Sequence, residues 1–405
     1  MTTQQVAVTE RMLDIDAHEM TPTHFWGEIF GPVAGELAEL AVPLFKKTGA
    51  NDFYNPTLAG DLEPIDEHTV WNIRGTRAPS AFDLSRRVEA LDTMGIRRQL
   101  VFPSYGLVPM HLQAGPGAAI RHAMELGSRS EDEIQDLGRR GLEEYNEWAV
   151  RMTGSAPDRL RPVAYLSPSH RTPGELFAEA KDLVDRGIRA VHLNAGTPPG
   201  GRSPADPELD ELWAYLAERD VAVTTHLGSE ADFVATIQWM KAPAFAPGKV
   251  ESHEIGLEPY SFATLHFSHT NWLVCLILGG VFERHPRLRF GVIEAGASWF
   301  GPLAESLDMW ATKVYAKRLE PFISMKPSEY MARNVRITPF NNFEDVADMF
   351  RRYPQVADCY AFSTDFPHIE GGTDVKRKHL AALDGLGDDV LEKFFATNGE
   401  LLLPD

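Results

Sequence analysis

The feature that most constrains the fold is a rhythm of short apolar segments that alternate with helical ones. Eight such segments have the length and composition of buried strands, and they end near residues 16, 102, 166, 193, 225, 294, 338 and 363. Buried parallel strands that alternate with helices are typical of α/β folds, and eight of them predict a closed (β/α)₈ barrel, the TIM-barrel architecture. A doubly wound open sheet is the alternative, but no Gly-x-Gly-x-x-Gly turn follows the first strand.

Local signals place the helices between these strands. Thr172-Pro-Gly-Glu begins one helix, which Gly187 ends, and Asp206 followed by Pro207 begins the next. Apolar residues at helical spacing predict further helices over about 34–47, 131–152 and 270–284, and from about 343.

Two segments interrupt the rhythm. The first, about 19–95, is rich in proline, glycine and aromatic residues and is too apolar for a disordered linker. The second, about 229–262, is rich in loop-forming residues, and we interpret it as a lid. We therefore expect residues 1–405 to form a single barrel domain with two insertions.

Charge and cysteine content exclude several classes of protein. The chain has 39 basic and 58 acidic residues, a formal charge of −19, which argues against nucleic acid and anionic membranes as partners. No stretch approaches the roughly 18 apolar residues of a membrane span, and no secretory signal is evident. Two cysteines, Cys275 and Cys359, lie in apolar surroundings, where we expect buried thiols. A cytoplasmic protein that acts on a small molecule is expected.

Polar residues line one face of the first strand. In Met12-Leu-Asp-Ile-Asp-Ala-His18, apolar residues alternate with Asp14, Asp16 and His18. Residues two apart on a strand point to the same side, so these three side chains share a face. Two carboxylates and an imidazole are costly to bury unless a positive group satisfies them, and a divalent metal does so. The alternative is an edge strand with a polar face and no metal.

Other strand ends carry the same residue types. His192 and Asn194 end the fourth strand, His226 the fifth and Glu294 the sixth, and Asp365 follows the eighth. Barrels of this kind place their chemistry at the C-terminal ends of the strands, and histidine with carboxylate suits Zn²⁺, Fe²⁺ or Mn²⁺. Each residue has an alternative role: His226 as a core histidine, Asp365 as a helix cap, His192 as a substrate-binding group. Glu294 is a ligand, a proton carrier or a hydrogen-bonding partner.

Four segments together resemble the amidohydrolase superfamily, and more narrowly its amidohydrolase-related branch. That branch includes aminocarboxymuconate-semialdehyde decarboxylase and resorcylate-type decarboxylases. The resemblance is scattered from residue 12 to residue 370 and implies a metal-bearing barrel, with Asp16, His18, His226 and Asp365 as the ligands. The four segments are Asp16-Ala-His18, Thr225-His-Leu227, Gly280-Val-Phe-Glu-Arg-His-Pro-Arg-Leu-Arg-Phe290 and Ser363-Thr-Asp-Phe-Pro-His-Ile-Glu-Gly371.

Two departures from the family pattern make the expected site more anionic. The usual first-strand motif is His-x-His, and here its first member is Asp16. Family decarboxylases generally carry His-Gly-Gly at the end of the sixth strand, where the histidine transfers a proton, and here the stretch reads Glu294-Ala-Gly296. Additional carboxylates favour iron or manganese over zinc, and Glu294 leaves room for a second ion. We therefore expect one or two divalent ions per chain.

The expected reaction is hydrolysis of a carbonyl compound by metal-activated water. Asp365 would accept the water proton and pass it to the leaving group, and His192, His269 or His368 would donate to the developing oxyanion. A carboxylate-lined site favours a neutral substrate: an amide, ester, lactone or thioester. Aromatic residues of the two insertions would enclose its apolar or aromatic acyl part.

Two other functions remain open. Non-oxidative decarboxylation of an aromatic or unsaturated acid is the best-known activity of the branch that the chain resembles. A catalytically silent barrel with a binding role is the less expected alternative, because all four implied ligands are present. Dimers are common among similar barrels, and a homodimer is expected by that analogy.

Overall fold

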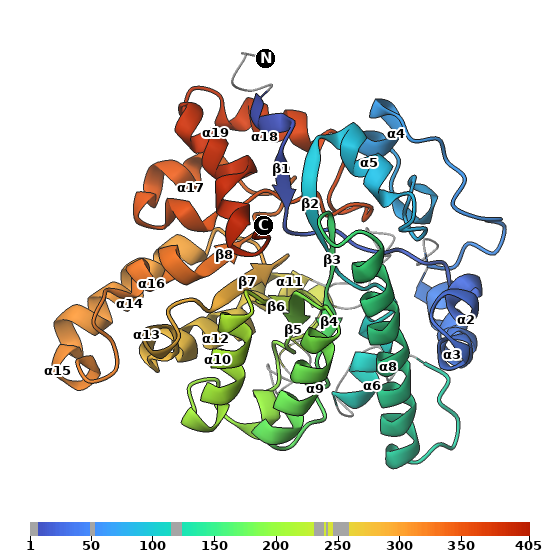
Figure 1. Ribbon diagram of the computed structural model, residues 1–405, viewed down its shortest axis with the longest axis horizontal. Coiled ribbons are helices and arrows are strands. Elements are labelled where there is room, and N and C mark those ends of the chain that lie inside the picture. Colours follow the sequence, from blue (N-terminus) through green and yellow to red (C-terminus); the bar gives the residue numbers. More distant parts are fainter. Residues whose placement is uncertain (1–6, 49–52, 115–123, 231–238, 240–241, 246–258) are drawn as a thin grey trace.

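The structure is a computed structural model, and it describes residues 7–48, 53–114, 124–230, 239, 242–245 and 259–405. Short parallel strands run through the centre of the molecule and helices surround them (Figure 1). One sheet comprises β1 (Met12–Asp14), β2 (Ile96–Val101) and β3 (Leu160–Pro162). The other comprises β4 (Ala164–Tyr165), β5 (Ala190–His192), β6 (Ala222–His226), β7 (Arg289–Ile293) and β8 (Val335–Ile337).

Backbone hydrogen bonds join the two sheets into a closed barrel. Only Val163 separates β3 from β4, and its N–H donates to the Val101 carbonyl at 2.9 Å, so β3 and β4 are halves of one strand. The segment around residues 360–366 takes the eighth place, because it forms isolated parallel bridges with Ile337 and Ala17. Asp365 N–H donates to the Asp16 carbonyl at 2.8 Å and completes the ring. The predicted (β/α)₈ barrel is confirmed.

The predicted helices are present, except that one of them is divided into two. Ser130 and Thr172 cap α8 and α9, each accepting a hydrogen bond from the backbone N–H three residues later. The helix expected over 270–284 is two helices, α12 and α13, because Gly280 adopts a φ of 72° that interrupts the helix. The helices are α5 (Arg87–Met94), α6 (Leu107–Gln113), α8 (Glu131–Ser155), α9 (Pro173–Asp185), α10 (Asp210–Glu218), α11 (Pro259–Thr264), α12 (His266–Leu278), α13 (Val281–Arg284), α14 (Phe300–Met309), α15 (Ala316–Leu319), α16 (Pro327–Asn334), α17 (Val346–Arg352), α18 (Val375–Leu383) and α19 (Asp388–Phe395).

The first insertion is folded against the barrel. It contains α2 (Trp26–Ile29), α3 (Pro32–Thr48) and α4 (Glu67–Asn72). Phe30 stacks on Tyr105, with ring centroids 4.5 Å apart, and lies 5.4 Å from the ring of Trp148 on α8. The second insertion, 229–262, lies largely outside the described residues, so its interpretation as a lid stays a prediction.

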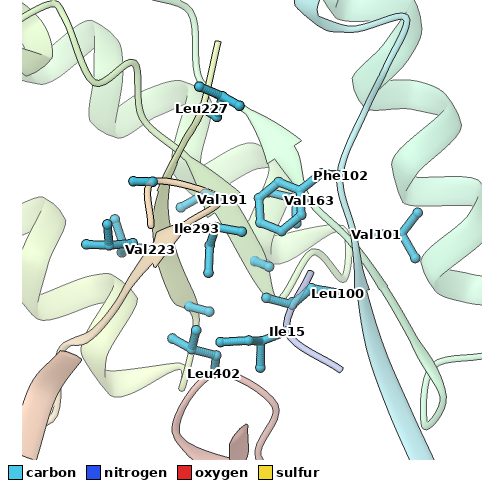
Figure 2. Close-up of a cluster of buried hydrophobic side chains, with 14 of the residues drawn as sticks. Ile15, Leu100, Val101, Phe102, Val163, Val191, Val223, Leu227, Ile293 and Leu402 are labelled. Atoms are coloured by element: carbon cyan, nitrogen blue, oxygen red, sulfur yellow. The ribbon is translucent and has the colours of Figure 1, made fainter. Parts of the chain in front are cut away.

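Apolar side chains from successive strands meet in one buried cluster, which includes Ile15, Leu100, Phe102, Val163 and Ile293 (Figure 2). Of the two cysteines, Cys359 is buried, but Cys275 is only partly buried, so the expectation of two buried thiols is wrong for Cys275. None of the helices in the described part of the chain combines the length and apolar composition that crossing a bilayer requires.

Arginines close one end of the barrel. Four of them, near the starts of four strands, donate to backbone carbonyls of residues 398–404 at 2.6–2.9 Å. These carbonyls reduce the cost of burying the guanidinium groups, although Nε of Arg161 and of Arg289 has no hydrogen-bond partner among the described residues. The polar residues predicted to carry the chemistry therefore lie at the opposite end, where the strands finish. The four arginines are Arg98, Arg161, Arg289 and Arg336.

Candidate metal centre

Six of the residues singled out in the sequence meet at the C-terminal ends of the strands. One atom each of Asp16, His18, His226 and Glu294 lie within 4.8 Å of one another. A second group with the same spacing joins His18 and Glu294 to two residues of the eighth strand end, Asp365 and His368. All six side chains are buried. Alternation along β1 and the alignment of strand ends explain why residues so distant in sequence converge.

The distances make His18 and His226 the centres of the cluster. His18 Nε2 lies 3.4 Å from Asp16 Oδ1 and 3.3 Å from Asp365 Oδ1. His226 Nε2 lies 3.4 Å from Asp16 Oδ1 and 3.6 Å from Glu294 Oε2. Each imidazole therefore faces two carboxylates, and Asp16 faces both imidazoles.

The donor set fits a divalent metal ion. Asp16 Oδ2 and both ring nitrogens of His18 have no hydrogen-bond partner in the part of the chain that the structure describes. Neither Asp16 nor Asp365 forms an ion pair with a lysine or arginine among those same residues. Leaving buried polar groups unsatisfied costs about 1–3 kcal/mol each, and more for charged groups. A cation bound by carboxylate oxygens and imidazole nitrogens removes that cost.

His226 is held in the tautomer that a metal ligand needs. Its Nδ1 lies 2.9 Å from the carbonyl oxygen of Leu227, which can only accept, so Nδ1 carries the proton and donates. The lone pair is then on Nε2, the nitrogen that faces Asp16 and Glu294. Histidine ligands of metals commonly donate their other ring N–H in this way.

Charge coupling shifts two pKa values within the cluster. Burial lowers the pKa of His18, but the Asp16 and Asp365 carboxylates outweigh burial and raise that pKa above its ordinary value. Burial raises the pKa of Asp365, but His368 and His18 outweigh it and hold the pKa below its usual range. Asp365 is therefore ionised at neutral pH, the state in which it can ligate a cation or accept a proton.

Two of the carboxylates stand on strained backbone. Glu294 has a φ of 52° and Asp365 a φ of 50°, the left-handed region that residues other than glycine rarely adopt. Such strain costs about 1–3 kcal/mol per residue and concentrates at functional sites. Thr338 supports the Glu294 turn, because its Oγ1 accepts the Glu294 N–H at 2.7 Å.

A buried hydrogen-bond network beneath the cluster joins the first and eighth strands. Asp14 accepts from Thr364 N–H at 2.9 Å, from the Thr364 hydroxyl at 2.6 Å and from Gln99 Nε2 at 2.7 Å. Arg87 in turn donates to Gln99 Oε1 and to the His18 carbonyl. Burial, opposed by these hydrogen bonds, raises the pKa of Asp14 to about 7. The sequence indicated that Asp14 shares a face with Asp16, but the partners from other strands were not foreseen.

Glu19 fixes the loop that follows β2. Its Oε1 accepts from the N–H groups of Ser104 and Tyr105, and its Oε2 accepts from the N–H and hydroxyl of Thr21. Ser104 is thereby held with its Oγ 3.2 Å from His368 Nε2. Sequence reasoning missed both residues; a glutamate directly after Asp16-x-His18 was the available signal.

Two predicted catalytic residues lie outside the metal-binding groups. His192 stacks on Tyr165 with ring centroids 4.1 Å apart, and burial, with smaller effects of His226 and His269, lowers its pKa well below the ordinary value. His269, on α12, has Nδ1 2.9 Å from Thr225 Oγ1. The catalytic roles of His192 and His269 stay predictions.

Comparison with known proteins gives one family. The model of the amidohydrolase family matches residues 115–404, more than half of the chain. No curated protein matches the sequence.

Solved structures of low sequence identity share the fold over nearly the whole chain. An amidohydrolase from Mycobacterium avium subsp. paratuberculosis is 18% identical with a TM-score of 0.63, covering 98% of each chain. The 5-carboxyvanillate decarboxylase from Sphingomonas paucimobilis is 14% identical with a TM-score of 0.57, covering 97% of this chain and 98% of that one. The same enzyme from Novosphingobium aromaticivorans, complexed with manganese, is 20% identical with a TM-score of 0.54, covering 97% and 96%.

Proposed function

This chain belongs to the amidohydrolase family, and on that premise we propose that it is a metal-dependent hydrolase of an uncharged carbonyl compound. The observation that carries the proposal is a buried cluster of two groups that share His18 and Glu294. One group adds Asp16 and His226, the other adds Asp365 and His368, and within each group the ligand atoms lie within 4.8 Å of one another. The family is one of metal-dependent enzymes, and the donor set of this chain is of the kind that holds a divalent metal.

Asp16, His18, His226 and Asp365 would hold the ion, and Glu294 would be a further ligand or would share a second ion. A divalent ion bound there lowers the pKa of a water molecule and polarises a carbonyl oxygen. Three carboxylates in the set favour a hard ion such as manganese or iron over zinc.

Asp365 is the residue assigned to proton transfer. His368 and His18 keep its carboxylate ionised, so it accepts a proton from the attacking water and delivers it to the leaving group. His368 is placed for the accompanying role of donor to the developing oxyanion. Its ring stacks on His18 at a centroid distance of 3.7 Å, and Ser104 Oγ lies within 3.2 Å of its Nε2.

The same carboxylates restrict the substrate. Asp16, Glu294 and Asp365 lie together in a buried site, where like charges interact strongly because the local dielectric is low. An anionic substrate group placed among them is disfavoured. An amide, ester, lactone or thioester brings no such charge, and this class of substrate is the one proposed.

Decarboxylation is the second candidate, because two 5-carboxyvanillate decarboxylases share the fold over 97% of this chain. That reaction needs the substrate carboxylate to enter the same site. Glu294 opposes it, since it stands where family decarboxylases generally carry the histidine that transfers a proton.

One experiment separates the two reactions. Protein loaded with manganese is incubated in H₂¹⁸O with aryl esters, anilides, lactones and thioesters, and in parallel with carboxyl-¹³C-labelled hydroxybenzoic acids. The proposal predicts ¹⁸O in the carboxylate product; release of ¹³CO₂ without ¹⁸O incorporation contradicts it.

Two aspartate-to-asparagine variants test the proton transfer. Asp365→Asn keeps one oxygen that can ligate but cannot accept a proton, so at saturating Mn²⁺ it should bind metal and lose turnover, whereas Asp389→Asn, an exposed change of the same kind on α19, should behave as wild type. Near-normal turnover of Asp365→Asn would remove Asp365 from the mechanism.

A further inference from the structure

Two stacked rings in the barrel carry buried polar atoms that no described residue satisfies. Tyr165 ends β4 and His192 ends β5, and their rings stack with centroids 4.1 Å apart. No more than 1% of either residue is exposed. The Tyr165 hydroxyl and both ring nitrogens of His192 form no hydrogen bond to any residue that the structure describes. Buried polar groups are rarely left unpaired, so these three atoms are expected to bind a further group.

Strand register places this pair on the inner face of the barrel wall. Tyr165 is paired with His192, and His192 with Thr224, which lies two residues before His226 on β6. Residues paired in register point to the same face of a sheet, as do residues two apart on a strand. Tyr165 and His192 therefore face the same side as His226, at the end of the barrel where the metal-binding groups lie.

Neither ring of the pair changes its protonation near neutral pH. Burial, followed by the charges of Asp16 and Glu294, raises the pKa of Tyr165 well above its ordinary value. Burial lowers the pKa of His192 well below its ordinary value. Groups that carry protons in catalysis have pKa values near the working pH, so this pair is suited to hydrogen bonding and not to proton transfer. A neutral phenol and a neutral imidazole each offer one donor and at least one acceptor.

We propose that Tyr165 and His192 bind an uncharged polar group on the acyl part of the substrate, and so select substrates that carry a hydroxyl or carboxamide there. The inference rests on the proposed function, because it takes the scissile carbonyl to lie at the metal centre. A hydroxyl or carboxamide both donates and accepts, which matches what the two rings offer. A charged group fits less well, since neither ring carries a charge to offset it in a buried site. A site of this kind rejects an analogue that lacks the group, because its own buried polar atoms are then left unpaired.

Calorimetric titration of the Mn²⁺-loaded protein tests the pair with benzamide, meta-hydroxybenzamide and para-hydroxybenzamide. These uncharged probes differ only in one hydroxyl group. The wild type should bind one hydroxybenzamide about 10-fold more tightly than benzamide, because each neutral hydrogen bond contributes about 3-fold to affinity. Tyr165→Phe keeps the ring that stacks on His192 and removes only the hydroxyl. It should lower this preference about 3-fold and leave the affinities for benzamide and Mn²⁺ unchanged.

Tyr145→Phe is the matched control. The Tyr145 ring lies 6.1 Å from that of Tyr165, but its hydroxyl donates to the Val163 carbonyl at 3.0 Å. Tyr145→Phe should therefore lower the melting temperature and keep the preference for the hydroxylated probe. Tyr165→Phe removes a hydroxyl without a partner among the described residues, so it should leave the melting temperature unchanged or raise it.

Three results overturn the inference: a wild type that does not prefer either hydroxybenzamide, a preference that persists in Tyr165→Phe, and an equal loss of preference in Tyr145→Phe. These results are separable from those of the ¹⁸O experiment. A preference that depends on Tyr165 in a protein that hydrolyses none of the carbonyl compounds supports the binding pair and contradicts the proposed function. Hydrolysis with a preference that does not depend on Tyr165 does the reverse.

Discussion

Replacing Asp14 by asparagine should weaken metal binding without removing a ligand. Asp14 is fully buried and accepts hydrogen bonds at both carboxylate oxygens, from Thr364 and Gln99. Thr364 precedes Asp365, and Asp14 stands two residues before Asp16, so the carboxylate ties together two strands that carry proposed ligands. Its role is to position those ligands.

The size of the effect follows from the donors that lose a partner. Asparagine keeps one oxygen but places an NH₂ group where Asp14 accepts hydrogen bonds. The Thr364 hydroxyl can rotate and accept from that NH₂ group. The Gln99 amide cannot reverse, because its Oε1 accepts from Arg87 at 2.9 Å. One buried donor left unpaired costs about 1–3 kcal/mol of unfolding free energy. Loss of a group that orients metal ligands typically reduces metal affinity by about 10–100-fold.

The assay is calorimetric titration of the chelator-stripped protein with Mn²⁺, paired with urea unfolding. Asp61→Asn is the matched control. Asp61 is also a carboxylate with several donors, accepting from the N–H groups of Ser80, Phe82 and Asp83, but it lies in the first insertion. Asp61→Asn should lose stability and keep its Mn²⁺ affinity. The positioning role of Asp14 is refuted if Asp14→Asn binds Mn²⁺ as tightly as wild type, or if Asp61→Asn loses affinity equally.

Two further predictions concern stability. Burial lowers the pKa of His379 from 6.5 to about 4, so the unfolded chain takes up this proton first as the pH falls, and up to about 3 kcal/mol of unfolding free energy is lost between those values. His379→Gln keeps a donor for Asn341 Oδ1 and should flatten that acid-side loss in urea unfolding; an unchanged slope would contradict the assignment. Gly301→Ala places a Cβ 2.2 Å from the Tyr353 ring and should cost about 1–3 kcal/mol, whereas Gly154→Ala, with open space around it in α8, should be neutral or stabilising. Equal melting temperatures for these two variants would show that the Tyr353 contact is not tight.

The fold could be predicted because its signals are local. Strand composition, the cap at Thr172 and the proline after Asp206 each act within a few residues, and the eight-strand rhythm follows from them. The division of the helix at Gly280 was missed because an isolated glycine inside a helical pattern is tolerated at a cost of about 1 kcal/mol, and its φ of 72° depends on tertiary packing.

The part of the candidate site that could be predicted is the part that follows from side-chain periodicity and strand ends. Asp16 and His18 share a face of one strand, and His226 stands at a strand end, so their meeting followed from barrel geometry. Gln99 and Ser104 could not be placed, because their role depends on pairing between strands and on a loop that Glu19 holds. His192, at a strand end, and His269, on α12, were predicted as donors to the oxyanion and not as ligands; both lie outside the metal-binding groups, and their roles stay predictions.

Metal content per chain tests the central claim most directly. The protein is purified without chelator or immobilised-metal resin and measured by plasma mass spectrometry, with His226→Gln in parallel. One or two equivalents of manganese, iron or zinc are expected in the wild type and a marked loss in His226→Gln, because Nε2 of His226 faces two carboxylates of the cluster. A wild type that carries no metal and binds none of these three ions when they are added would contradict a metal-dependent site.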